Sequence, residues 1–159
     1  YDLLYLLSTP LTTGWVGMHA KKRYRLPYLF EVGDLWPLAA IQLGGIKNAW
    51  LMRFLYTFEE KIYNNAQLLA GLSPEIKQAM EYTVSYAKKV EVLPNMADCT
   101  FFKPCPDLNE AFSPESPLVI GYQGAIGRAN HLEYLIDFAH EALQQNLPIQ
   151  IRIMGEGSE

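Results

Sequence analysis

Short apolar runs alternate with longer stretches of helical periodicity along most of the chain. The runs are typical of strands that lie inside a sheet, and the stretches between them are long enough for helices. This alternation predicts β-α units, a parallel sheet and therefore an α/β fold. The expected strands are residues 3–7, 28–32, 68–72, 90–93, 118–120 and 149–154, and the expected helices are residues 12–25, 48–65 and 132–145, with another beginning at 73–75.

Two of the expected helices begin with recognisable capping residues. Asn48 precedes the longest helical stretch, and Ser73-Pro74-Glu75 combines a hydroxyl cap, a proline at the first helical position and an acid in the first turn. The first apolar run, residues 3–7, has no polar alternation. We therefore expect this strand to be buried on both faces.

A proline-rich segment divides the chain into two parts. Residues 104–117 carry four prolines among Asp, Asn, Glu and Ser, which is typical of a linker between domains. We expect residues 1–103 to belong to one domain and residues 118–159 to open a second. The second part is too short to bury a core of its own. Because the chain begins at Tyr1 beside a strand and ends in a loop, we expect it to be a piece of a longer protein.

The helix expected at residues 48–65 is apolar on nearly all sides. Trp50, Phe54 and Phe58 form one stripe, and other apolar residues crowd the remaining faces. The first interpretation is that this helix is buried in the core. The second is that it contacts another domain or lies peripherally on a membrane surface. Glu59 and Glu60 point in different directions on a helix, so we interpret them as a solvated edge and not as an acid pair.

Charge and cysteine content narrow the class of protein. The net charge is -4, which argues against nucleic acid as a partner. The basic residues at positions 21–25 are interpreted as the solvated end of a helix. Cys99 and Cys105 have no metal-binding or disulfide spacing, so we expect a cytoplasmic protein. No apolar run approaches the roughly 20 residues of a membrane span.

The strongest local motif is a glycine-rich stretch at residues 121–128, between an expected strand and an expected helix. Glycines let the backbone approach a phosphate, and the amides at a helix start favour an anion. Arg128 could donate forked hydrogen bonds to a diphosphate. Tight packing alone is the competing explanation of these glycines.

The same glycine spacing also fits short-chain NAD(P)-dependent dehydrogenases. That family would require a Tyr-x-x-x-Lys pair, and no tyrosine in the chain has a lysine four residues later. The strand after the loop is followed by Gly155-Glu156-Gly157 instead of the acid that would bind a ribose. The dehydrogenase interpretation is therefore disfavoured.

Five stretches in order resemble the family 4 (group 1) glycosyltransferases across essentially the whole chain. They are most similar to the enzymes that build bacterial surface polysaccharides, including N-acetyl-fucosamine transferases. The stretches are residues 30–37 (FEVGDLWP), 72–74 (LSP), 92–98 (VLPNMAD) with Phe102 and Pro104, 124–128 (GAIGR) and 151–157 (IRIMGEG).

The resemblance implies a GT-B fold, in which two Rossmann-like domains bind the acceptor and the nucleotide sugar, respectively. It places Asp34 at a strand end, where this catalytic residue would orient an acceptor hydroxyl. Asn95 and Asp98 would lie at the interdomain hinge. The residues implied for the donor are Gly124, Gly127, Arg128, Asn130, Gly155, Glu156 and Gly157.

The function implied is sugar transfer from a nucleoside diphosphate to a glycan or lipid-linked acceptor, with retention of configuration and without a metal ion or other cofactor. The glutamates that hold the donor sugar in this family would lie beyond Glu159, so this chain alone is expected to be inactive. The competing hypothesis is a non-catalytic Rossmann-like module that binds a nucleotide or a protein partner.

Overall fold

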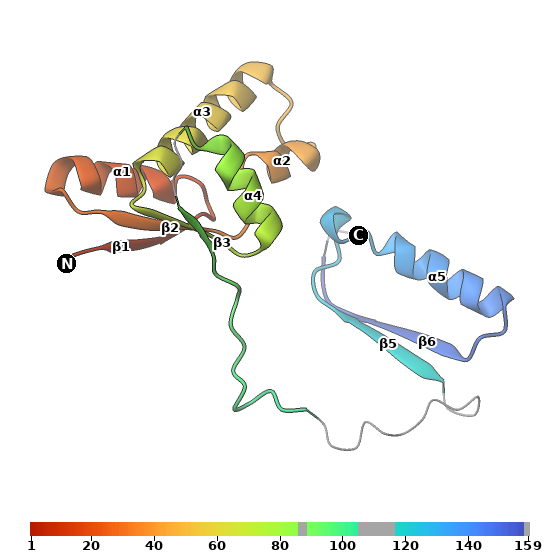
Figure 1. Cartoon of the computed structure of the whole chain (residues 1–159). Helices are drawn as coiled ribbons and strands as arrows, with labels where there is room; N and C mark the ends of the chain where they lie inside the picture. Colours follow the sequence, from red (N-terminus) through yellow and green to blue (C-terminus); the bar gives the residue numbers. More distant parts are fainter. Residues whose placement is uncertain (86–88, 105–116, 158–159) are drawn as a thin grey trace. The chain divides into compact units, whose positions relative to one another are not determined.

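The computed structural model of the chain describes residues 1–85, 89–104 and 117–157. It divides into two compact units, Tyr1–Asp98 and Cys99–Glu159, which we call unit 1 and unit 2 and describe separately (Figure 1). The proposed linker, residues 104–117, falls almost entirely outside the described residues, as does Cys105. The assignment of acceptor and donor domains stays a prediction.

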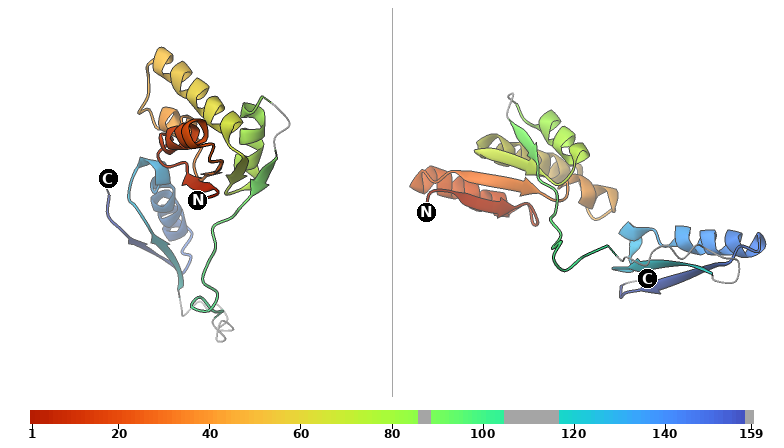
Figure 2. Two further views of the ribbon diagram at one scale, coloured as in Figure 1. Left: turned by 90° about the vertical axis from the view of Figure 1, so that its left-hand side faces the viewer. Right: turned by 60° about the horizontal axis from the view of Figure 1, so that its bottom comes forward.

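Unit 1 is a four-stranded sheet with order β1-β2-β3-β4, and every neighbouring pair is parallel. The order of strands in the sheet is therefore their order in the chain. Helices α1, α3 and α4 connect consecutive strands and lie on the same side of the sheet (Figures 1 and 2). The elements are β1 (Leu4–Leu7), α1 (Thr13–Tyr24), β2 (Tyr28–Val32), α2 (Leu38–Gln42), α3 (Ala49–Asn65), β3 (Leu68–Gly71), α4 (Pro74–Thr83) and β4 (Val90–Val92).

The core of unit 1 lies between the sheet and these helices. Most of its members are apolar residues of β2, β3 and β4 and inward residues of α3 and α4, and Leu11 and Ala66 lie in the connecting segments. Tyr28 is fully buried and donates a hydrogen bond from its hydroxyl to the Ile62 carbonyl at 2.6 Å. The buried cluster contains Leu11, Tyr28, Phe30, Val32, Ile62, Tyr63, Ala66, Leu69, Met80 and Val90.

The predicted caps are confirmed. The side-chain oxygen Oδ1 of Asn48 accepts hydrogen bonds from the backbone amides of Trp50 and Leu51, at 2.9 and 3.1 Å. The Ser73 hydroxyl accepts one from the Ile76 amide at 3.3 Å. These contacts satisfy backbone donors that have no partner inside the helix.

The prediction that the first strand is buried on both faces is wrong for this chain. Tyr5 and Leu7 are 54% and 56% exposed, because they point to the side of the sheet that α1, α3 and α4 do not cover. β1 is also an edge of the sheet. The apolar run therefore predicted the strand correctly, but it did not predict whether both faces of the strand are covered.

The interpretation of Glu59 as part of a solvated edge is also wrong. Glu59 is 5% exposed, whereas Glu60 is exposed and accepts a hydrogen bond from the Ser85 hydroxyl at 2.8 Å. Burial raises the pKa of the Glu59 carboxyl to about 7, and a hydrogen bond from Tyr63 acts in the opposite direction. Burial and the neighbouring Glu59 both raise the pKa of Tyr63.

We expect Glu59 to make the stability of unit 1 depend on pH. Because the folded pKa is above the ordinary value of 4.5, its protonated form favours folding below pH 4.5, and this contribution is lost as pH rises through about 7. A shift of this size corresponds to about 3 kcal/mol. The Glu59→Gln variant should therefore be more stable than the parent at pH 8 and similar at pH 4. Unfolding monitored by tryptophan fluorescence tests this, since Trp15, Trp36 and Trp50 all lie in unit 1.

The control is Glu60→Gln, the neighbouring exposed acid. It should leave the pH profile of the parent unchanged. If Glu59→Gln and the parent lose stability in parallel between pH 4 and pH 8, Glu59 does not carry the effect.

Unit 2 contains a pair of parallel strands covered by one helix. β5 (Leu118–Gln123) pairs with β6 (Ile149–Met154) from Leu118↔Ile149 to Gln123↔Met154. A short 3₁₀ helix, η1 (Arg128–Asn130), and α5 (Glu133–Gln144) connect them. In the described parts of both units, no helix is long and apolar enough to cross a membrane.

Candidate functional site

The two loops that follow β5 and β6 lie against each other at one edge of unit 2. The Gly124 amide donates a hydrogen bond to the Met154 carbonyl at 3.0 Å, and the Ile126 amide donates one to the Glu156 carbonyl at 2.9 Å. Ile126 and Gly157 form a further parallel bridge. The ladder between the strands thus continues into the glycine-rich loops, and it brings the predicted donor residues of both loops together.

Two glycines make this approach possible. A Cβ atom on Gly155 would overlap the carbonyl oxygen of Gly124, and one on Gly157 would overlap that of Ile126. These obstacles are backbone atoms, so a side-chain rotation cannot relieve them. In contrast, a Cβ on Gly121 would meet no atom within 4 Å. The glycines after β6 are therefore required by the contact between the loops.

The sequence predicted that the first loop leads directly into the helix α5. In the structure it does not. Arg128–Asn130 form η1, and His131 follows with the left-handed φ of 47° before α5 starts. The first amides of α5 are already paired, since Tyr134 and Leu135 donate to the carbonyls of His131 and Leu132. A ligand at this loop would therefore meet η1 and not the start of α5.

Arg128 and Asn130 are both exposed on η1, immediately after the glycine-rich loop. The Asn130 amide donates to the Gly127 carbonyl at 2.9 Å, which closes the 3₁₀ turn. The Tyr122 hydroxyl donates to the Ala125 carbonyl at 2.8 Å and holds the middle of the loop. The Arg128 guanidinium group is therefore carried by a loop whose backbone is held by hydrogen bonds within the loop itself.

The one acid at the start of α5 is paired locally. The Glu133 carboxylate lies 3.0 Å from the Nδ1 atom of His131. Hydrogen bonds from its own backbone amide and from His131 lower the pKa of Glu133. His131 is exposed.

In unit 1, Asp34 follows β2 at the carboxyl edge of the sheet and is exposed. The preceding residue, Gly33, donates from its amide to the Ser8 hydroxyl at 3.2 Å. Helix α2 begins after Pro37, and no side chain caps it, so Asp34 does not cap this helix. Open parallel sheets bind ligands at this edge.

Ser8 is the residue that the sequence analysis missed at this edge. It is 2% exposed, and its amide donates to the Glu31 carbonyl at 2.8 Å, so it ties the end of β1 to the end of β2. The available signal was a small polar residue directly after an apolar run. Ser8 positions the backbone that carries Asp34.

The remaining predicted residues lie after β4. Asn95 and Asp98 belong to an irregular segment, and the division between the units falls directly after Asp98. Asp34, Asn95 and Asp98 are thus in unit 1, whereas the predicted donor residues are in unit 2. Their proposed roles stay predictions.

Within residues 1–85 and 89–98, unit 1 has surface depressions that are not lined by any of these residues, and two of them adjoin α4. One, of about 740 Å³, lies between α3 and α4 and is lined by Glu59, Glu60, Arg53, Tyr56 and Tyr82, among others. The other, of about 470 Å³, lies along α4. Across residues 1–85, 89–104 and 117–157, no group of three or more His, Cys, Asp or Glu residues is placed to hold a metal ion.

Comparison with known proteins gives one family match. Residues 1–96 match the family described as "Glycosyl transferase 4-like domain". This match covers unit 1 almost completely, including Asp34 and Asn95. No curated protein matches the sequence.

Two solved structures share the fold of the chain. One is the sucrose-phosphate synthase of Thermosynechococcus elongatus, with 16% identity and a TM-score of 0.57 over 98% of this chain and 45% of that protein. The other is TarM, with 11% identity and a TM-score of 0.60 over 98% of this chain and 28% of that protein. The chain therefore spans less than half the length of either structure.

Proposed function

Since the chain belongs to the glycosyl transferase 4-like domain family and has the α/β fold of GT-B glycosyltransferases, we propose that the protein carrying it transfers a sugar from a nucleoside diphosphate to an acceptor. The family match over residues 1–96 is the observation that carries this proposal. The acceptor is a glycan or a lipid-linked glycan of bacterial surface polysaccharide synthesis. Transfer retains the configuration of the sugar and uses no metal ion. The resemblance described above supports these finer assignments.

In this proposal the loops of unit 2 bind the donor diphosphate. Two glycine-containing loops meet there, and Arg128 is exposed at the end of the first. A guanidinium group that is already in place stabilises charge as it develops on a leaving diphosphate. Asn130 and Glu156, both exposed on the same loops, contact the ribose or the sugar.

A nucleotide titration tests the assignment of ligand class. We expect the protein to bind UDP- or GDP-sugars in preference to NADH and NADPH, measured by calorimetry. Preference for the dinucleotides would favour the dehydrogenase alternative. Binding of none of these ligands would favour the non-catalytic module. Product analysis by NMR, with and without EDTA, tests retention and metal independence.

Asp34 is proposed to accept a hydrogen bond from the acceptor hydroxyl and to orient it for transfer. We expect the Asp34→Asn variant of the full-length protein to lower the turnover of sugar transfer about 10- to 100-fold, because orientation of the nucleophile is lost. Donor affinity should stay unchanged, since Asp34 is in unit 1. Asp2→Asn, which alters another exposed acid of unit 1, is the control. Equal turnover of both variants would contradict the role of Asp34.

A further inference from the structure

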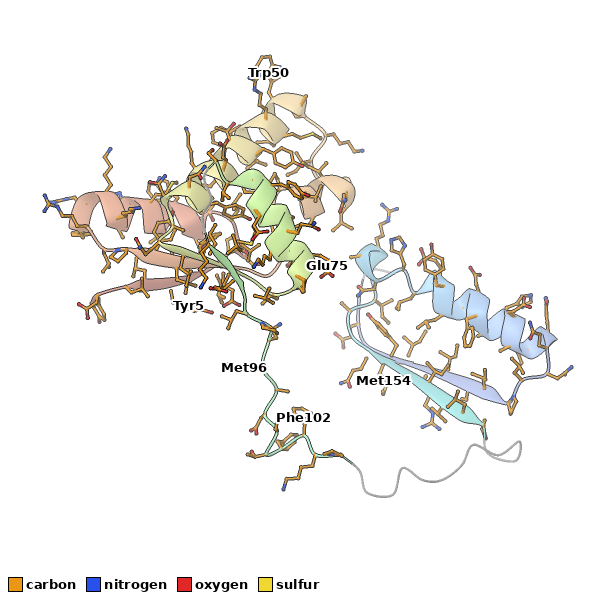
Figure 3. All side chains as sticks on the ribbon, in the orientation of Figure 1. Tyr5, Trp50, Glu75, Met96, Phe102 and Met154 are labelled. Carbon is orange, nitrogen blue, oxygen red and sulfur yellow. The ribbon has the colours of Figure 1, made fainter. Side chains whose placement is uncertain are left out.

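An apolar projection of unit 1 is left uncovered in the structure. We call it the α3 tip and define it as residues 43–54, which comprise the segment between α2 and α3 and the first turns of α3. Leu43, Trp50, Leu51 and Phe54 are 56%, 81%, 45% and 64% exposed. Figure 3 shows Trp50 at the end of α3, pointing away from the rest of unit 1. The expectation that the stripe of Trp50 and Phe54 is core is therefore wrong.

The other end of α3 is buried in the core, so the helix that carries the tip is firmly packed. Ile62 and Tyr63 are 0% and 1% exposed. Phe58 packs against this core and stacks on Phe54 with ring centroids 6.2 Å apart. The Asn48 side chain caps the first turn through the amides of Trp50 and Leu51. The exposed apolar residues therefore stand on a capped helix that is anchored in the core.

The charge around the tip has one sign. Between residues 35 and 58 the only charged residues are Lys47 and Arg53, both exposed, in a chain with a net charge of -4. Lys47 precedes Trp50 by three residues and Arg53 follows it by three. An exposed tryptophan flanked by cations, in a stretch of the chain that contains no acid, is complementary to the interface of an anionic bilayer.

We propose that the α3 tip docks the protein on the surface of a bilayer that contains anionic lipids. Trp50, Leu51 and Phe54 enter the interfacial region, and Lys47 and Arg53 contact lipid phosphates. This inference rests on the proposed function, because a lipid-linked acceptor would be met at that surface. α3 begins at the carboxyl edge of the sheet, the edge that also carries Asp34.

A second basic region provides the matched control. Residues 21–25 at the end of α1 are basic, and Trp15 on the same helix is 60% exposed. This region lies at the other end of α3, since the Lys21 ammonium donates to the carbonyl of Asn65, the last residue of α3, at 2.6 Å. The α1 region therefore has an exposed tryptophan and cations, as the α3 tip does, but it lacks the capped apolar projection of the tip.

The test is sedimentation of the full-length protein with vesicles of phosphatidylcholine alone or mixed with phosphatidylglycerol. We expect binding to the mixed vesicles that weakens with salt. Trp50→Ser/Phe54→Ser should weaken vesicle binding at least about tenfold, because it removes the aromatic side chains that enter the interfacial region. Lys47→Glu/Arg53→Glu should also weaken it at least about tenfold, because two cations near the surface contribute about 1 kcal/mol each. Trp15→Ser and Lys22→Glu/Arg23→Glu should change it less than about twofold. Circular dichroism of each variant checks the fold.

Several outcomes would overturn the proposal: no binding of the wild type to mixed vesicles, equal binding by the tip variants, or loss only in the α1 variants. Self-association that the tip variants abolish, without vesicle binding, would assign the surface to a second copy of the chain. The assay uses no nucleotide, so a failed donor titration and a failed vesicle assay are separate results.

Discussion

Replacement of Arg128 by alanine is expected to weaken binding of a nucleoside-diphosphate sugar by the full-length protein about 10- to 100-fold. This range corresponds to the loss of a charge-assisted hydrogen bond, which contributes about 1.5–3 kcal/mol. Arg128 is exposed on η1, directly after the loop that pairs with the segment beyond β6. Calorimetric titration of the variant measures the effect.

Arg152→Ala is the matched control, because Arg152 is an exposed arginine of the same unit that donates to the Gln150 side chain at 3.1 Å. It should leave donor affinity unchanged. Arg128→Lys should fall between the parent and the alanine variant, since a lysine keeps the charge but not the fork. Hydrogen exchange of the Ile126 amide verifies that the loop stays folded. Unchanged affinity in Arg128→Ala would remove the diphosphate from this loop.

The Gly157→Ala variant is expected to separate the two loops of unit 2. The added methyl would overlap the Ile126 carbonyl, so the backbone must shift, at a cost of about 1–3 kcal/mol. The hydrogen bond from the Ile126 amide to Glu156 should open more often. Exchange of that amide should therefore become at least about tenfold faster, as measured by NMR. Donor affinity should fall with it.

Gly121→Ala serves as the comparison, because the same methyl would enter open space on β5. Its effect on stability should stay within about 0.5 kcal/mol. If the Ile126 amide is as protected in Gly157→Ala as in Gly121→Ala, then close contact between the loops is not needed for their structure.

Features that depend on a few neighbouring residues could be predicted from the sequence. The caps at Asn48 and Ser73 bond amides two or three residues away, so the sequence itself contains both partners. The strands at Tyr28–Val32 and Ile149–Met154 have the expected bounds because apolar runs and their flanking turns are local signals. The α/β class follows from their alternation.

Features that depend on what covers a surface could not be predicted. Tyr5, Trp50 and Glu59 were each assigned the wrong environment, because burial is decided by the packing of helices on one side of the sheet. The left-handed residue His131, which ends η1, had no glycine or asparagine signal. Local sequence specifies the elements, whereas exposure is a property of their assembly.

In the candidate site, the glycines that follow β5 and β6 could be predicted to lie near each other, since the carboxyl ends of adjacent parallel strands share an edge. The hydrogen bonds between the two loops could not, because their register depends on the geometry of the turns. Ser8 was missed for the same reason, since its partner Gly33 is 25 residues away. The roles of Asp34 and Arg128 remain for the experiments above.

The match between chain order and strand order in unit 1 bears on synthesis at the ribosome. Because the order is β1-β2-β3-β4, each new strand extends the sheet at its growing border, beside the strand that was made just before it. Among these four strands, none has to be inserted later between two partners that have already joined. By the same geometry, a nascent polypeptide stopped after β2 or β3 would already contain, for each pair of consecutive strands made so far, the two partners that adjoin in the final sheet.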